Sequence, residues 1–254
     1  NINSNRRKAF LKEISNKKYK NVFKECIYFS IEIQDCYANN SNRNRHVPSE
    51  VIDRMYKTFN VPMYNEGWDN IQIIHRSPRT YSTSLYQITA IDFKEMIYRT
   101  NSYDIMTLLR DFIPEFNDIY EVPQDSSYHT FSISRHIYHV FDYVKRSNKI
   151  EGKNRVLYAS LFHDIAKGYC KNFNKDSRYA NFKYHENIGS QWTVRILKNL
   201  GYEDDFIIDV AELVQLHMKL SYKESNSVDR LLRDLGDVKL QQLILLRNAD
   251  KASR

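Results

Sequence analysis

The stretch that most constrains the fold is residues 157–168, Leu-Tyr-Ala-Ser-Leu-Phe-His-Asp-Ile-Ala-Lys-Gly. His163 and Asp164 lie next to each other inside an apolar run that is typical of a buried helix, and Lys167 follows one turn later. Burying these groups together costs free energy unless they form a hydrogen-bonded ionic cluster or hold a metal ion with a phosphate ligand. The rest of the chain must therefore supply partners for this pair.

Other predicted helices also carry a His or an Asp on the side that their apolar residues mark as facing the core. Each such residue alone is typical of a hydrogen-bonded core side chain. Together they bring imidazole and carboxylate groups from separate helices toward one core. The positions are His136, His163, Asp164, His185, His217 and Asp250, in or beside helices predicted over 132–147, 154–167, 186–199, 204–219 and 237–251.

These side chains predict a metal site. Imidazole nitrogens and carboxylate oxygens are ligands of first-row transition metals such as Mn, Fe, Co and Ni. Cysteine is absent from the set, which argues against a structural zinc site. Four His and two Asp exceed the protein ligands that one ion usually takes, so we expect one or two divalent ions, with Mg²⁺ as a further option.

Composition sets the broad class. With 254 residues the chain is long enough for one large or two ordinary domains, and no apolar run approaches the 18 residues of a membrane span. Three scattered cysteines form no disulfide framework, so a reducing cytoplasm is the expected location. Residues 1–90 hold 14 Lys and Arg against 8 Asp and Glu, an excess that suits a polyanionic partner such as nucleic acid.

The predicted elements divide the chain in two. Residues 1–85 alternate between a basic helix over 4–20, a strand over 26–33, a polar loop over 39–46 and a short strand over 71–74, which indicates a partial α/β segment. Residues 91–254 read almost entirely as helix, with a loop over 172–183. The predicted fold is therefore mainly α, an all-helical domain preceded by a partial α/β segment.

The order of the six ligand positions resembles the metal-dependent HD phosphohydrolase superfamily. The segments that carry this resemblance are RHIYHV at 135–140 and LFHDIAKG at 161–168, and residues 231–253 are similar to the closing helices of the HD domains of bacterial tRNA nucleotidyltransferases.

The resemblance also implies roles for single residues. His136, His163, Asp164 and Asp250 would hold a first ion, whereas His185 and His217 would complete a second ion site or bind the scissile phosphate. Asp164, Lys167, His185 and His217 would be catalytic, with Lys167 neutralising a phosphate oxygen. His129 would contact substrate. His139 is the rival of His136, one turn away, and we expect it to pack beside the site.

Residues 27–74 resemble the second half of a P-loop polynucleotide kinase, in which Arg43 and Arg45 would be lid residues that contact the donor phosphates. No Gly-x-x-x-x-Gly-Lys-Ser/Thr sequence exists in these 254 residues, so they cannot act as a kinase alone. The resemblance favours a kinase half that is missing from the N-terminal side. A relic used for docking or for RNA binding is the other interpretation.

The two resemblances together imply an enzyme of nucleic-acid end healing. It would remove a 3′-phosphate or a 2′,3′-cyclic phosphate from RNA or DNA ends, beside a 5′-kinase module. One alternative is an HD nucleotidase or phosphodiesterase that acts on free or cyclic nucleotides. An alternative of another class is a catalytically idle RNA-binding module.

Overall fold

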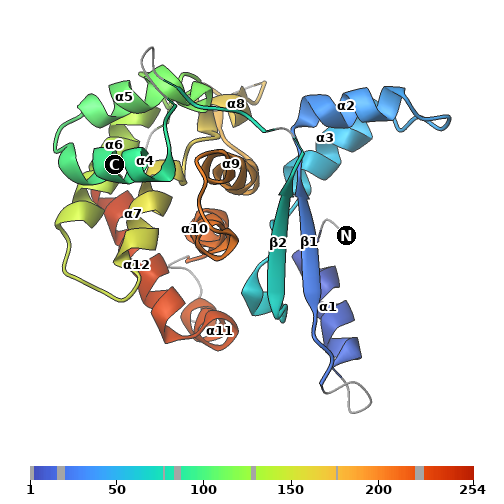
Figure 1. Cartoon of the computed structure of the whole chain (residues 1–254). Coiled ribbons are helices and arrows are strands. Elements are labelled where there is room, and N and C mark those ends of the chain that lie inside the picture. The colour runs from blue at the N-terminus through green and yellow to red at the C-terminus, as the bar shows by residue number, and fades with distance from the viewer. Residues whose placement is uncertain are drawn as a thin grey trace.

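The computed structural model describes residues 3–15, 21–76, 78–82, 87–126, 130–175, 177–220 and 226–254, without the side chains of 226 and 227. This part of the chain is mainly helical, as predicted (Figure 1). The helices are α1 (Ser4–Ile14), α2 (Ile33–Ser41), α3 (Ser49–Thr58), α4 (Ala90–Arg99), α5 (Asp104–Phe112), α6 (Ile133–Arg146), α7 (Lys153–Phe162), α8 (Lys167–Cys170), α9 (His185–Asn199), α10 (Asp204–Leu216), α11 (Asn226–Leu235) and α12 (Asp237–Ala252). Among these residues, no helix is both long and apolar enough to cross a bilayer.

In the described residues, two small sheets accompany the helices. Strands β1 (Glu25–Ser30) and β2 (Asn70–His75) pair in parallel, with Cys26 opposite Ile71. Strands β3 (Asn172–Phe173) and β4 (Ala180–Asn181) form a short antiparallel hairpin between α8 and α9. This hairpin is a small departure from the all-helical domain that the sequence predicts, and it falls inside the predicted loop over 172–183.

The β1–β2 sheet packs against the helical part of the chain. In Figure 1 it stands beside α9 and α10, with α1 on its other side and α2 and α3 above it. Ile71 and Ile73 are buried. The Ile73 amide donates a hydrogen bond to Asp204 Oδ2 at 2.8 Å, and the Val61 amide donates one to Gln215 Oε1, also at 2.8 Å. Buried residues of β1 and β2, among them Tyr28, Ile71 and Ile73, therefore belong to the same hydrophobic core as the helices.

The structure corrects several predicted boundaries in the first third. The strand predicted over 26–33 ends at Ser30, and α2 occupies Ile33–Ser41, so the predicted polar loop begins only after Ser41. β-branched residues up to Ile33 extend the strand pattern, whereas in the structure Ile33 is the first residue of α2 and its side chain is buried in the core. The predicted basic helix over 4–20 is described only as Ser4–Ile14, and residues 16–20 lie outside the described part of the chain.

Two predicted helices also end early, and both end at the predicted ligands. The helix expected over 154–167 stops at Phe162, and a turn separates it from α8. The helix expected over 204–219 stops at Leu216 and continues as a 3-10 turn over His217–Lys219. An apolar pattern of helical period cannot report such a break, because the turn residues Ile165 and Ala166 are as buried as the helix before them.

A buried ion pair joins α1 to the 3-10 turn that precedes β2. Arg7 Nε donates to Glu66 Oε2, and Arg7 Nη2 donates to Glu66 Oε1, both at 2.7 Å. Trp68 Nε1 also donates to Glu66 Oε2 at 3.1 Å. The bidentate geometry offsets the cost of burying both charges, whereas loss of the guanidinium leaves a buried carboxylate without its cation.

We expect Arg7→Met to lower the free energy of unfolding by about 3–5 kcal/mol, because Glu66 stays buried without its counter-ion. The matched control is Arg6→Met on the exposed side of the same helix, for which little change is expected. Urea unfolding followed by circular dichroism measures both. Equal stability of the two variants would contradict the structural role of the Arg7–Glu66 pair.

Candidate metal centre

Helix ends deliver the predicted ligands to one place. His163 and Asp164 occupy the turn after α7, His185 is the first residue of α9, and His217 opens the 3-10 turn after α10. His136 on α6 and Asp250 on α12 complete the set. The four His side chains and Asp164 are buried, and Asp250 is partly buried.

Backbone carbonyl groups orient all four imidazole rings. His163 Nδ1 lies 2.9 Å from Ser160 O, His185 Nδ1 lies 2.7 Å from Phe182 O, and His217 Nδ1 lies 2.6 Å from Val214 O. In each of these the carbonyl belongs to the residue three positions earlier. His136 Nδ1 lies 2.9 Å from the carbonyl oxygen of Ser253, at the end of α12.

These contacts decide the tautomer of each ring. A carbonyl oxygen can only accept, so Nδ1 must be the nitrogen that donates. In a neutral imidazole the Nε2 atom is then left with a free lone pair. Each ring therefore presents Nε2 to the interior of the site as a metal donor, which is the arrangement that metal-ligating histidines use.

The Nε2 atoms face each other in pairs. His136 Nε2 and His163 Nε2 are 3.3 Å apart, and His185 Nε2 and His217 Nε2 are 3.2 Å apart. Two lone pairs at this distance repel unless a cation or a proton lies between them. The donor geometry therefore fits divalent ions.

Asp164 lies between the two pairs. Its Oδ2 is 3.3 Å from His136 Nε2 and 3.3 Å from His163 Nε2, whereas its Oδ1 is 3.3 Å from His185 Nε2 and 3.8 Å from His217 Nε2. Two donor groups result, each with ligand atoms within 4.8 Å of one another. The first donor group is His136, His163, Asp164 and Asp250, and the second donor group is Asp164, His185 and His217.

The electrostatics of the site keep its carboxylates charged. Burial opposes ionisation of Asp164, but Lys167 and the neighbouring histidines hold the pKa of this carboxyl well below its usual range. Burial likewise opposes ionisation of Asp250, and the hydrogen bond with His136 lowers its pKa. Both groups are therefore anionic at neutral pH and suited to a cation.

Within the donor groups, His136 and His217 have shifted pKa values and differ in charge. Burial lowers the pKa of His136, but hydrogen bonds with Asp164 and Asp250 outweigh it and raise the pKa to about 9. A proton on His136 Nε2 then stands where a cation would bind. Burial, together with the neighbouring His185 and His163, lowers the pKa of His217 to about 3, so this ring is neutral and its Nε2 is free to ligate.

Lys167 is fixed beside the shared carboxylate. Its Nζ lies 2.6 Å from Asp164 Oδ2, donates to Gln124 Oε1 at 2.9 Å, and sits 5.4 Å from the centre of the Phe182 ring. It faces an open cleft of about 640 Å³. The residues that line this cleft are Ser126, Asp164, Lys167, Ala180, Phe182, Lys183, Tyr184, His185, Glu186, His217, Met218, Asp250 and Arg254.

Not every predicted site residue reaches this cleft. His139 lies outside both donor groups and packs on Phe131, with ring centres 4.5 Å apart. Arg43 borders a separate apolar cavity beside α2 and α3, and Arg45 is exposed; neither lines the cleft. His129 lies outside the residues that the structure describes.

The structure adds cleft residues that the sequence did not single out, among them Lys183, Tyr184, Met218 and Arg254. Arg254 lies one helical turn after Asp250, and its Nη2 donates to Asp250 Oδ2 at 3.3 Å. That spacing was a usable signal, since residues four apart share a helix face. Lys183 and Tyr184 directly precede His185 and belong to the predicted loop and its junction with α9.

We expect His136→Ala to lower the metal content of the purified chain, because the first donor group loses its central imidazole. His139→Ala is the matched control on the same face of α6 one turn later, and it should keep the wild-type metal content. Elemental analysis of both variants after loading with Mn²⁺, Co²⁺ or Ni²⁺ measures the difference. Equal losses in the two variants would contradict the assignment.

Gly168 ends the stretch that carries the ligands, and it has no room for a side chain. A Cβ atom there would lie 1.8 Å from the carbonyl oxygen of Asp118. We expect Gly168→Ala to destabilise the chain by about 1–3 kcal/mol, since α8 must move away from this carbonyl. Gly189→Ala is the control, because its Cβ would meet only ordinary contacts at 3.5 Å or more. Thermal unfolding compares them, and equal stability would refute the close approach.

The comparison with known proteins agrees with this geometry. Residues 133–254 match the family described as HD domain, and all six predicted ligands lie within the match. No curated protein matches the chain. An HD domain indicates a metal-dependent hydrolase, and the His and Asp groups found here fit a metal site. The match therefore supports an HD-superfamily domain at residues 133–254.

Proposed function

We propose that the chain is a metal-dependent phosphohydrolase that removes a 3′-phosphate or a 2′,3′-cyclic phosphate from the ends of nucleic acids. One observation supports the hydrolase activity most directly. The Nε2 atoms of four histidines surround the Asp164 carboxylate, two near Oδ2 and two near Oδ1. Two donor groups that share one carboxylate suit a pair of Mn²⁺, Fe²⁺, Co²⁺ or Ni²⁺ ions, or Mg²⁺. Such ions supply Lewis acidity and an activated water for phosphoryl chemistry.

The protein residues hold the phosphate. Lys167, Lys183 and Arg254 border the cleft, and their positive charges suit a phosphate that approaches the donor groups. Lys167 is the deepest of the three and is buried. Its amino group is held in place by Gln124 and Asp164, so it can stabilise negative charge that develops on a phosphate oxygen without first reorganising.

The kinase-like first third supports the choice of nucleic-acid ends. In residues 27–74 the parallel strands β1 and β2 are joined by α2 and α3, a connection that suits part of a P-loop kinase sheet. The absence of a phosphate-binding Gly-rich loop from the sequence means that we propose no kinase activity for these residues. A 5′-kinase module and a 3′-end phosphatase would together prepare both kinds of nucleic-acid end for repair.

Hydrolysis assays test the proposal. We expect the chain with Mn²⁺, Co²⁺ or Ni²⁺ to release phosphate from a 3′-phosphorylated RNA oligomer, or to open a 2′,3′-cyclic end, faster than it hydrolyses free mononucleotides. The double variant His163→Ala, Asp164→Ala should be inactive, because both donor groups lose a ligand. Asp164→Asn, which keeps the shape of the side chain, should also lose activity.

The outcomes separate the alternatives. A faster reaction with free or cyclic nucleotides would favour a nucleotidase. No metal and no turnover would favour an idle binding module. Activity of the double variant equal to that of the wild type would show that hydrolysis occurs elsewhere.

Lys167 has a separate test. We expect Lys167→Gln to lower kcat by about 10²- to 10³-fold, since one preorganised positive charge is lost from the phosphate. Its metal content should stay close to that of the wild type, because Lys167 is not in either donor group. Lys94→Gln, exposed on α4, is the matched control and should leave kcat unchanged. An unchanged kcat in Lys167→Gln would remove this residue from the mechanism.

A further inference from the structure

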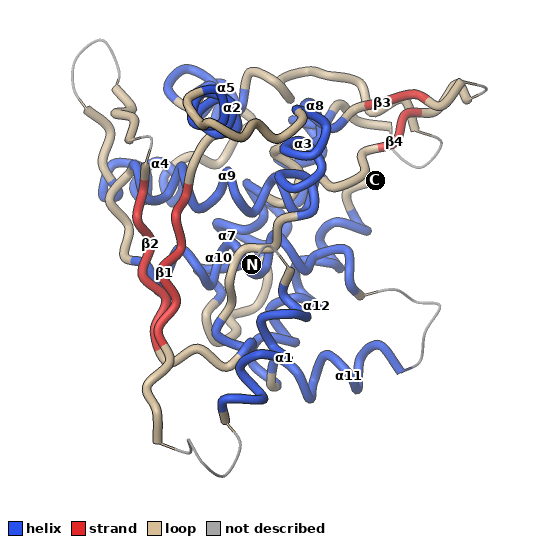
Figure 2. The backbone as a smooth tube through the Cα atoms, turned by 90° about the vertical axis from the view of Figure 1, so that its right-hand side faces the viewer, coloured by secondary structure: helices blue, strands red, loops and turns tan. Residues whose placement is uncertain are grey.

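The connection between α8 and α9 carries aromatic and basic side chains that phosphate hydrolysis does not require. It contains the hairpin β3–β4, which Figure 2 shows extending from the helices near the C-terminal end of the chain. In sequence this connection has one acidic residue, Asp176. Its aromatic and basic residues are Lys171, Phe173, Lys175, Arg178, Tyr179, Phe182, Lys183 and Tyr184.

This connection forms one wall of the cleft beside the donor groups. Ala180 of β4 lines the cleft, as do Phe182, Lys183 and Tyr184. The Ala180 amide donates a hydrogen bond to the carbonyl oxygen of Asp125 at 2.9 Å, which fastens the hairpin at the cleft edge. A strand of substrate that leaves the cleft along this wall therefore meets the hairpin next.

Three aromatic rings of this connection are exposed to solvent. Phe173 is 50% exposed, Tyr179 is 40% exposed and Tyr184 is 41% exposed. Single exposed apolar residues are common on protein surfaces, but these three lie close together in sequence. Tyr184 lines the cleft, and Phe173 pairs across the hairpin with Ala180, which also lines it. Rings that present a free face are suited to stack on planar ligands.

Positive charges accompany the rings. Lys171 Nζ lies 5.7 Å from the centre of the Phe173 ring, and the Arg178 guanidinium lies 4.9 Å from that of Tyr179. Lys171 also pairs with Asp125 at 2.5 Å, so part of its charge is neutralised. Lys175, Arg178 and Lys183 are exposed. Exposed rings interleaved with cations are the combination that binds single-stranded nucleic acid, whose bases stack while its phosphates pair with the cations.

We infer that residues 171–175 and 177–184 form a platform for a single strand of nucleic acid whose 3′ end enters the cleft beside the donor groups. This inference rests on the proposed function and names its substrate class, an oligonucleotide end. A free mononucleotide would fill the cleft without reaching Phe173 and Tyr179 on the hairpin. The rings are sequence-tolerant contacts, because every base has a face on which they can stack.

The test measures binding apart from turnover. Fluorescence anisotropy gives the Kd of the full, metal-loaded chain for a short single-stranded RNA with a 3′-hydroxyl, which is a product of the proposed reaction. The same sequence as single-stranded DNA, and a free mononucleotide, are measured in parallel. We expect Phe173→Ala and Tyr179→Ala each to raise the Kd for the oligomer about tenfold, because each removes a stacking partner.

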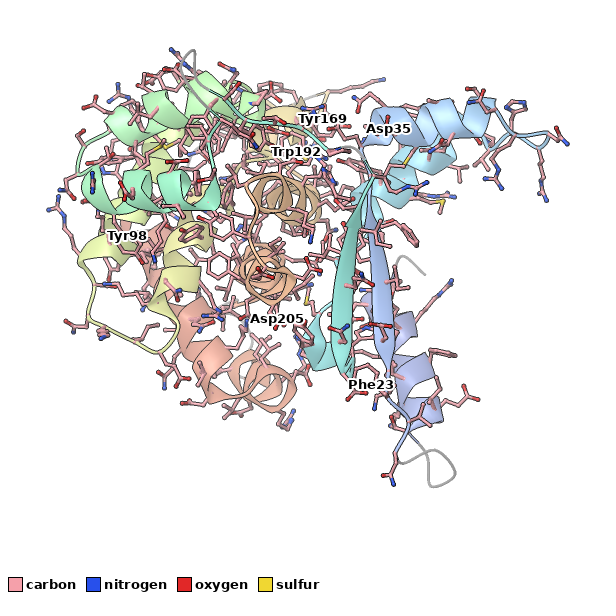
Figure 3. All side chains as sticks on the ribbon, in the orientation of Figure 1. Phe23, Asp35, Tyr98, Tyr169, Trp192 and Asp205 are labelled. Atoms are coloured by element: carbon pink, nitrogen blue, oxygen red, sulfur yellow. The ribbon has the colours of Figure 1, made fainter. Side chains whose placement is uncertain are left out.

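Matched controls come from α4, which Figure 2 shows on the other side of the molecule from β3 and β4. Tyr98, labelled in Figure 3, is 46% exposed on α4, and Tyr98→Ala should leave the Kd unchanged. Arg178→Gln should lower the steepness with which log Kd depends on log salt by about 0.7, since one phosphate contact is lost. Arg99→Gln, which removes an exposed charge from α4, should leave that slope unaltered.

The binding measurements can overturn the inference in three ways. The inference is wrong if Phe173→Ala and Tyr179→Ala leave the Kd for RNA and DNA unchanged. It is also wrong if Tyr98→Ala raises the Kd by the same amount. A mononucleotide that binds as tightly as the oligomer overturns it as well. Hydrolysis by the wild type is assayed alongside: a wild type that hydrolyses no phosphate but needs Phe173 and Tyr179 to bind the oligomer refutes the proposed function alone.

Discussion

A carboxylate buried between two pairs of imidazole rings is the interaction on which the helical domain depends. Asp164 has to be charged to balance Lys167 and any bound cation, and it is almost fully buried, so its desolvation must be compensated from several sides. Four other helices contribute a His or Asp side chain to the donor groups around Asp164. These helices are α6, α9, α10 and α12. The interruption between α7 and α8 is part of the same arrangement, because it places His163 and Asp164 side by side in a turn.

Much of this arrangement could be predicted from the sequence, and the reason is periodicity. His136 and Asp250 stand out because a helical apolar pattern has a polar group on its buried side, and such a group needs partners. The helices from α4 to α12 follow from the same pattern with small boundary errors, except α8, which begins where the predicted helix over 154–167 ends. What periodicity cannot predict is where a buried helix breaks, since the turn at His163–Ala166 is as buried as its surroundings and its last two residues, Ile165 and Ala166, continue the apolar pattern.

The first third was harder to predict for a different reason. Among the described residues, β1 and β2 are the only strands of this part, and two helices join them. At Ile33 the β-branched side chain favours a strand, whereas the structure begins α2 there. Arg7 is buried on a helix whose sequence reads as basic and solvent-facing, and only its pairing with Glu66 explains why. The partner of a buried charge lies 59 positions away, a distance that no local pattern spans.

The carbonyl groups that orient the imidazoles belong to the main chain, and this has a consequence for how the site can be lost. In many metal sites a second side chain holds the ligand ring, and a single substitution there loosens it. Here no substitution can remove the acceptor, because it is the backbone itself at Ser160, Phe182, Val214 and Ser253. The rings can turn only if a helix end frays. Any affinity of this domain for an ion would thus be a property of helix termini, and early local unfolding would release a bound ion before the core opens.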